Sequence, residues 1–363
     1  MQQSSRQNNI SALRFVAALM VLSGHMSFLI GGTPEMLWGH QIQAMGVKIF
    51  FLMGGYLVTK SWMSDPRPLR YALKRFSRIW PPLAVYVLFA AFVAGPCLST
   101  LPVGAYFRQP STYAYLRNLR LFIVYTLPGV FETNPYPAAV NGSLWTLPVE
   151  AAMYLAIPLM LCVLAPCGKK RRWTAPAAWG ICLLVCAASI AQQQWFPGAR
   201  LILYGTNWVD ALAILPYYFI GWACALTDGF RKVLNLQAAI ALLCAFQCFG
   251  LQGAVYNAVF MALFSYFVYS FAFAAPPLFS NAFSNYEISY GLYLYGFFIQ
   301  QIVVAEFLRR GRALSLPLVL AVSLFVTSLA ALLSCVLVEQ PVQRLSKRLL
   351  AECPGFRLKE KAG

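Results

Sequence analysis

Long apolar runs with few charges dominate the sequence and decide what the chain can fold into. A helix that crosses a bilayer needs ~20 consecutive, mostly apolar residues. Runs of that kind lie at about 10–31, 43–62, 79–98, 144–165, 174–191, 208–227, 233–250, 253–272, 286–308 and 316–338. Apolar residues make up 60% of the chain and charged residues only 11%, against roughly 25% charged in soluble domains. We therefore predict an all-α integral membrane protein: one polytopic bundle of about ten transmembrane helices over residues 1–363, with no fused soluble domain.

The basic residues predict the orientation of this bundle. The chain carries 28 Lys and Arg against 11 Asp and Glu, a net charge of +17. With the N-terminus inside, 20 of the 28 bases fall on the cytoplasmic side, as the positive-inside rule requires, and the cluster at 309–312 is the main exception. We expect both termini in the cytoplasm, membrane lipids as partners of the bases, and no binding of nucleic acid.

The stretch 99–143 interrupts the series of apolar runs. It is rich in proline and polar residues, and its apolar piece 119–131 is too short to cross a bilayer. We interpret that piece as a re-entrant or interfacial segment. The ten cysteines form no C-x-x-C pair and the chain has only two histidines, so we predict neither a disulfide nor a metal site.

Ionisable residues inside the predicted helices are candidates for function, because burying charge at membrane depth costs at least ~2.5 kcal/mol. Arg14 and His25 lie eleven residues apart in the first helix. At 100° per residue they share one face, ~16 Å apart along the axis. His25 is a candidate general base, because imidazole titrates near neutral pH. The alternative is an arginine that reaches to headgroups and a histidine that only bonds a neighbouring helix.

Lys48 and Glu150 are the other intramembrane charges that stand out, with Asp210 and Glu306 nearer to helix ends. Glu150 is a candidate partner of His25, able to orient the imidazole or stabilise its cation as the third group of a triad does. The alternative is a carboxylate at the start of a helix near the outer interface.

The segment 74–82 places Arg75 and Arg78 just before Pro81 and Pro82. Prolines fit the first turn of a helix, so we expect a helix to begin there. Two arginines beside such a start can bind phosphate, through their forked donors and the helix dipole. The alternative is anchoring by the positive-inside rule alone.

Five blocks carrying these residues occur in an order that resembles the acyltransferase-3 family of membrane O-acyltransferases. They are Leu13 to His25, Gly46 to Leu57, Arg75 to Pro81, Ser143 to Glu150 with Tyr154 and Pro158, and a final pair formed by Ile288 to Tyr295 and Val338 to Pro341. The resemblance covers nearly the whole chain. It departs at Gly54, where the family has serine, and at Tyr295-Gly296, where the family has Trp-His, so we assign no catalytic role to either place.

The resemblance implies an acyltransferase that takes its acyl group from cytoplasmic acyl-CoA and holds no tightly bound cofactor. The acyl group is expected to be acetyl, the acceptor a hydroxyl of a cell-envelope or exported carbohydrate or glycolipid, and the location a bacterial inner membrane. It also implies an essential His25, with Arg14, Arg75 and Arg78 contributing to donor binding or architecture. Further candidates for substrate binding or structural support are Lys48, Trp145, Tyr154, Asp210 and Tyr290.

Two other classes of protein also need buried charges around a cavity. A transporter or flippase for an envelope precursor is one, although the sequence shows no inverted repeat and no matched pair of broken helices. A membrane hydrolase is the other, because activation of water uses the same groups.

Overall fold

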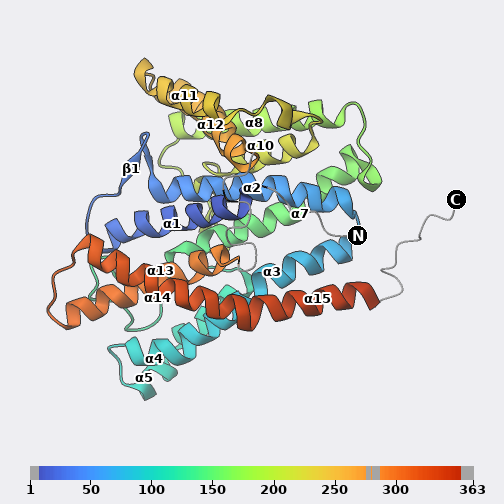
Figure 1. Cartoon of the computed structure of the whole chain (residues 1–363). Helices are drawn as coiled ribbons and strands as arrows, with labels where there is room; N and C mark the ends of the chain where they lie inside the picture. Colours follow the sequence, from blue (N-terminus) through green and yellow to red (C-terminus); the bar gives the residue numbers. More distant parts are fainter. Residues whose placement is uncertain (1–7, 275–278, 280–286, 353–363) are drawn as a thin grey trace.

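A computed structural model describes residues 8–274, 279 and 287–352, and these form a bundle of helices (Figure 1). The α-helices are α1 Ile10–Leu29, α2 Ile42–Ser64, α3 Pro68–Phe89, α4 Gly95–Leu98, α5 Val103–Arg108, α6 Pro110–Ala114, α7 Thr146–Leu164, α8 Thr174–Trp195, α9 Trp208–Ala211, α10 Leu215–Leu226, α11 Leu236–Phe246, α12 Gly253–Ala272, α13 Ser289–Arg309, α14 Leu316–Ser334 and α15 Gln340–Glu352. Two short antiparallel hairpins pair β1 Met36–Leu37 with β2 His40–Gln41, and β3 Ile202–Leu203 with β4 Thr206–Asn207.

The prediction of an all-α, multi-pass membrane protein is confirmed. Within the described residues, nine helical segments are long and apolar enough to cross a membrane. They are Ile10–Leu29, Ile42–Ser64, Pro68–Leu98, Gly142–Leu164, Thr174–Trp195, Trp208–Leu226, Gly253–Ala272, Ser289–Arg309 and Leu316–Ala351. The remaining predicted run, 233–250, forms only the shorter apolar helix Leu236–Phe249.

The third helix begins earlier than predicted, and this corrects the interpretation of its prolines. The helix starts at Pro68, so Pro81 and Pro82 lie inside α3 rather than in its first turn. The charged stretch before them is itself helical, and prolines are tolerated in membrane helices where neighbouring groups satisfy the freed carbonyls. Arg75 and Arg78 are therefore not at a helix N-terminus, and the dipole argument does not apply to them.

Two π-helical turns lie within long helices of the described residues. One, Ala90–Ala94, joins α3 to α4. The other, Cys335–Glu339, joins α14 to α15, so the last helix runs well beyond the predicted end at 338. Single π-turns within α-helices frequently mark functional positions.

The stretch 99–143 holds α5, α6 and the 3₁₀ turn Tyr115–Arg120. Beyond Leu121 the apolar piece 119–131 is irregular rather than helical, and its placement as a re-entrant or interfacial segment stays a prediction. Its backbone is tied down locally: the Asn118 side chain donates to the carbonyl of Val124 at 3.0 Å and accepts from its N–H at 3.0 Å.

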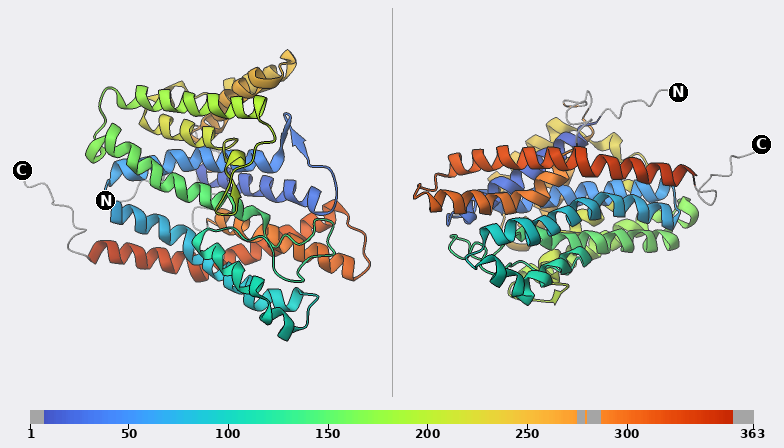
Figure 2. Two further views of the ribbon diagram at one scale, coloured as in Figure 1. Left: turned by 180° about the vertical axis from the view of Figure 1, so that it is seen from behind. Right: turned by 90° about the horizontal axis from the view of Figure 1, so that it is seen from below.

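Helix α2 lies at the centre of the bundle, between α1 and α10 (Figures 1 and 2). Glycines allow α2 and α10 to cross closely. A Cβ on Gly55 would collide with the carbonyl oxygen of Tyr218 in α10, and one on Gly221 would collide with that of Leu52 in α2. Small residues at such crossings are typical of membrane helix packing, where backbones must approach each other.

The two ends of the bundle differ. The end of α15, the start of α3 and the end of α7 lie together at one end (Figure 1). The β1–β2 hairpin and the connection between α13 and α14 lie at the opposite end.

Candidate functional site

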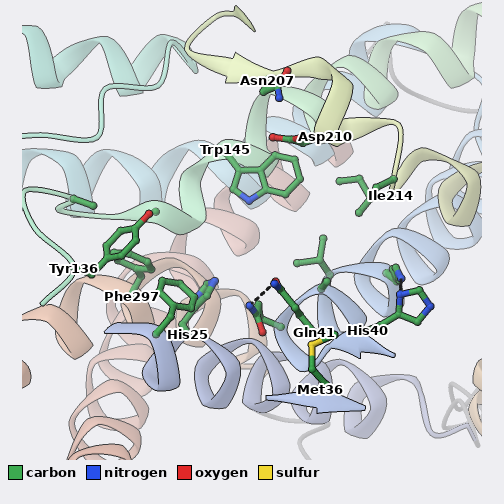
Figure 3. A pocket seen from close by; sticks show the side chains of 18 of the residues that line it. His25, Met36, His40, Gln41, Tyr136, Trp145, Asn207, Asp210, Ile214 and Phe297 are labelled. Atoms are coloured by element: carbon green, nitrogen blue, oxygen red, sulfur yellow. Dashed lines mark hydrogen bonds between the residues drawn. The ribbon is translucent and has the colours of Figure 1, made fainter. Parts of the chain in front are cut away.

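A cavity of about 870 Å³ opens among the helices near the β1–β2 hairpin, and we call it the His25 cavity (Figure 3). Its wall combines aromatic rings, side-chain amides and a few ionisable groups. It is lined by residues that include His25, His40, Gln41, Lys48, Tyr136, Trp145, Asn207, Asp210, Tyr217 and Phe297.

Both hairpins are built alike and both supply side chains to this cavity. Their two-residue loops are Trp38-Gly39 and Tyr204-Gly205, and all four of these residues have positive φ, as a type I′ turn requires. The first hairpin carries His40 into the cavity wall, and the second carries Asn207 into the opposite wall (Figure 3).

His25 is held by packing rather than by a hydrogen-bonded partner. Its ring makes edge contacts with Phe28 and Phe297, at centroid distances of 5.6 and 5.3 Å. Nδ1 is buried and has no hydrogen-bond partner among the described residues. Figure 3 shows the imidazole at the cavity wall, with Trp145 and Asp210 across from it.

Lys48 lies in the same wall and is only 6% exposed. Its Nζ is 3.1 Å from Nδ1 of His40 and 5.3 Å from the ring centroids of both Tyr217 and Phe260. Burial, and secondarily the charge of Lys48, lower the pKa of His40 to about 4. The His40 ring is therefore neutral near pH 7 and can accept a hydrogen bond from the ammonium group.

A second group of candidate residues lies away from the His25 cavity, around Glu287, just before α13. Arg14, which is 9% exposed, donates to the carboxylate of Glu287, and Nη2 of Arg78 lies 3.6 Å from the same carboxylate. Glu287 therefore bridges α1 and α3 electrostatically. We call Arg14, Arg75, Arg78 and Glu287 the arginine cluster.

Glu150 is linked to this cluster through Tyr154, which lies against Arg75. The guanidinium of Arg75 lies 5.7 Å from the ring centroid of Tyr71 and 5.5 Å from that of Tyr154. The hydroxyl of Tyr154 donates to the carboxylate of Glu150. Nε of Arg75 is buried and finds no hydrogen-bond acceptor in the described part of the chain.

A smaller cavity of about 320 Å³ adjoins the arginine cluster. Its wall includes Arg78, Glu287, Tyr290, Glu339, Arg344 and Lys347. Tyr290 is fixed there by donating to the carbonyl of Ile79 at 3.1 Å. This cavity is basic on its α15 side and acidic at Glu287 and Glu339.

The structure thus sorts the predicted site residues into two places. The His25 cavity brings together His25, Lys48, Trp145 and Asp210. The arginine cluster and its surroundings bring together Arg14, Arg75, Arg78, Glu150, Tyr154 and Tyr290. Arg14 and His25 share a face of α1 that is turned toward α13 and the segment before it, since Arg14 meets Glu287 and His25 meets Phe297.

Several residues of both places escaped the sequence interpretation. His40, Gln41 and Asn207 enter the cavity through hairpins, whose only sequence signal is the pair of aromatic-Gly dipeptides. Glu287 stands directly before the run that forms α13, and a carboxylate in that position could have been noted as a partner for Arg14.

Comparison with known families finds one that accounts for nearly the whole length. The model of a family described as an acyltransferase domain matches residues 7–337. No solved structure matches the chain.

Three curated proteins are similar to this chain. An O-acetyl transferase of Shigella phage Sf6 is 26% identical over 82% of this chain and 86% of its own length. Nodulation protein 10 of Rhizobium leguminosarum bv. viciae is 26% identical over 96% of both chains. Peptidoglycan O-acetyltransferase OatA of Listeria monocytogenes is 24% identical over 65% of this chain and 38% of its own length.

Proposed function

Since this chain belongs to the acyltransferase-3 family, whose model spans residues 7–337, we propose that it transfers an acetyl group from acetyl-CoA to a hydroxyl of a carbohydrate. The family makes it a membrane acyltransferase. The acetyl group and the carbohydrate acceptor rest on relatives whose names state O-acetyl transfer, in one case to peptidoglycan.

The His25 cavity is the proposed acceptor site. Aromatic rings such as Trp145 and Tyr136 offer apolar faces to a sugar ring, and amides such as Asn207 offer donors and acceptors to hydroxyls. A largely apolar wall with a few placed polar groups is the usual construction of a small-molecule site. This composition supports a carbohydrate better than a purely hydrophobic substrate.

The arginine cluster and the smaller cavity beside it form the proposed donor site. Guanidinium groups bind phosphate through paired donors, and Arg78, Arg344 and Lys347 line that cavity. The donor is proposed to enter from the cytoplasm, at the bundle end where α15 ends. Arg14 and His25 mark the two ends of a stripe ~16 Å long on α1, along which an extended pantetheine arm would carry its thioester toward the acceptor.

His25 is the proposed general base. As the acceptor oxygen attacks the thioester carbonyl, the imidazole takes the proton of the hydroxyl. The carbon–sulfur bond then breaks, an ester forms, and the CoA thiolate leaves and is reprotonated. The observation that carries this assignment is that His25 alone among the described histidines combines a place in the cavity wall with freedom from Lys48.

The test is acetyl transfer by purified protein in nanodiscs. Wild type is supplied with radiolabelled acetyl-CoA and fragments of peptidoglycan, O-antigen and exopolysaccharide. His25→Ala and His25→Gln should insert and fold, yet lose transfer by ~10²–10⁴-fold, the range expected of a general base. In proteoliposomes, which enclose a separate compartment, wild-type protein that moves a glycan across the bilayer without modifying it would support the transporter instead. Transfer within a few-fold of wild type in folded His25→Ala would remove His25 from this role.

A further inference from the structure

Lys48 is a buried cation in the wall of the His25 cavity, and no carboxylate of the described residues pairs with it. Within the described residues, its nearest partners are the neutral ring of His40 and the faces of Tyr217 and Phe260. None of the ion pairs of the described chain includes Lys48. The described part of the chain therefore leaves the positive charge of Lys48 uncompensated in the cavity wall.

Such an arrangement is costly unless it serves a ligand. Burial of an unpaired charge is strongly unfavourable, and buried cations are normally paired. Two aromatic faces and one imidazole nitrogen stabilise the ammonium group partly, but they bring no negative charge. Nε2 of His40 is also buried without a hydrogen-bond partner in the described residues, so this corner of the cavity keeps unused polar capacity.

Asp210 does not neutralise Lys48 from within the cavity. It is exposed, lies in the first turn of α9, and stands on the wall opposite His40 (Figure 3). The cavity thus has a cation at the α2 wall and a carboxylate at the α9 wall. An anion bound at Lys48 would be kept apart from Asp210 by the width of the cavity.

We propose that Lys48, supported by His40, binds the carboxylate of an acidic sugar, so that the acceptor of this enzyme carries a uronic or related carboxylic acid. The inference rests on the proposed carbohydrate acceptor. A single ammonium group beside a neutral imidazole matches one negative charge, whereas phosphate is typically held by forked guanidinium donors. The aromatic and amide groups around Lys48 suit the rest of a sugar ring.

The experiment measures binding without any acyl donor, so it does not depend on transfer activity. Purified protein in detergent is titrated at fixed ionic strength with glucuronate, galacturonate and N-acetylneuraminate. Matched neutral probes are the methyl esters of the same acids, and glucose 1-phosphate tests a phosphate. Ligand-induced shifts of the melting temperature give apparent dissociation constants.

At least one acid should bind about 10- to 100-fold more tightly than its methyl ester, the range given by one hydrogen bond to a charged group. Lys48→Met should abolish that preference. Lys60→Met should keep it, since Lys60 is exposed on the same helix and contacts the ring of Tyr56 instead of the cavity. The comparison of acid with ester needs only wild-type protein, so it remains decisive if Lys48→Met does not fold.

The proposal is overturned if no acid in the panel binds better than its ester, or if glucose 1-phosphate binds and the carboxylates do not. An unchanged preference in folded Lys48→Met also overturns it. Failure of acetyl transfer with preserved acid preference would instead count against the proposed reaction and leave the anion site standing.

Discussion

The hydroxyl of Tyr154 donates a hydrogen bond to the carboxylate of Glu150, one turn earlier in α7. Through Tyr154 this carboxylate is linked to Arg75, and it does not line the His25 cavity. Its charge therefore acts on the arginine cluster rather than on the imidazole. A partner that oriented His25 would need to reach Nδ1, which has no partner in the described structure.

We expect Glu150→Gln to reduce kcat by less than about tenfold, against the ~10²–10⁴-fold loss of a general base. Glutamine keeps an acceptor oxygen for Tyr154 but loses the charge. The dependence of kcat on pH should not change, because Glu150 does not line the His25 cavity. Steady-state kinetics of wild type and Glu150→Gln across pH 5–9 checks this. A plot of kcat against pH that is displaced by one pH unit in Glu150→Gln would place the carboxylate beside the imidazole.

Replacing Arg75 and Arg78 by lysine should raise the KM for acetyl-CoA about tenfold or more while insertion is intact. Lysine keeps the charge but loses the forked pair of donors that fits phosphate. Arg120→Lys serves as the control, because Arg120 ends a 3₁₀ turn, is not part of the arginine cluster and lines neither cavity. An unchanged KM for acetyl-CoA in both variants would indicate that these arginines only anchor the protein in the membrane.

The orientation of the bundle is tested by single cysteines in a cysteine-free background. Trp173→Cys, between α7 and α8, should react with an impermeant maleimide only after the membrane is permeabilised. Arg312→Cys, between α13 and α14, should react in intact cells, because we place that end of the bundle outside. The reverse pattern would invert the proposed route of the donor.

The apolar runs predict most of the bundle because each span must satisfy its own backbone in lipid. They fail where helices leave the lipid. The charged start of α3, from Pro68, carries no apolar signal, and prolines 81 and 82 mimic a helix start although the helix passes through them. The last helix likewise continues through Pro341 as α15.

The site was predictable only in part, for a physical reason. Helical periodicity places Arg14 and His25 on one face, and their contacts with Glu287 and Phe297 agree. Periodicity within one helix does not determine which helices are neighbours. It therefore could not show that Glu150 lies near the arginine cluster. Nor could it place His40 beside Lys48, because a two-residue hairpin makes that contact.

The crossing of α2 and α10 depends on two glycines, and Gly55→Ala should destabilise the protein by ~1–3 kcal/mol, the usual cost of overpacking. The new methyl group would collide with the carbonyl of Tyr218. Gly180→Ala in α8 is the matched control, since a Cβ there meets open space, and it should be neutral or stabilising by ~0.5–1 kcal/mol. Thermal unfolding in detergent distinguishes them; equal melting temperatures would contradict the tight crossing.

Acid should destabilise the protein at the β1–β2 hairpin through His40. The pKa of His40 is lowered to about 4 by burial and by the charge of Lys48. In the unfolded chain a histidine titrates at ~6.5, so the unfolded state binds the proton more readily. The contribution of neutral His40 to stability is thus fully present above ~6.5 and is lost as the pH falls toward 4. We expect wild type to lose more of its melting temperature between pH 7 and 4.5 than His40→Gln, which has no group that titrates there. The loss of melting temperature of Lys48→Met should lie between those of wild type and His40→Gln. This variant removes the charge that lowers the pKa of His40 but leaves the imidazole buried. If the melting temperatures of wild type and His40→Gln fall by the same amount between pH 7 and 4.5, His40 is not held neutral in the folded protein.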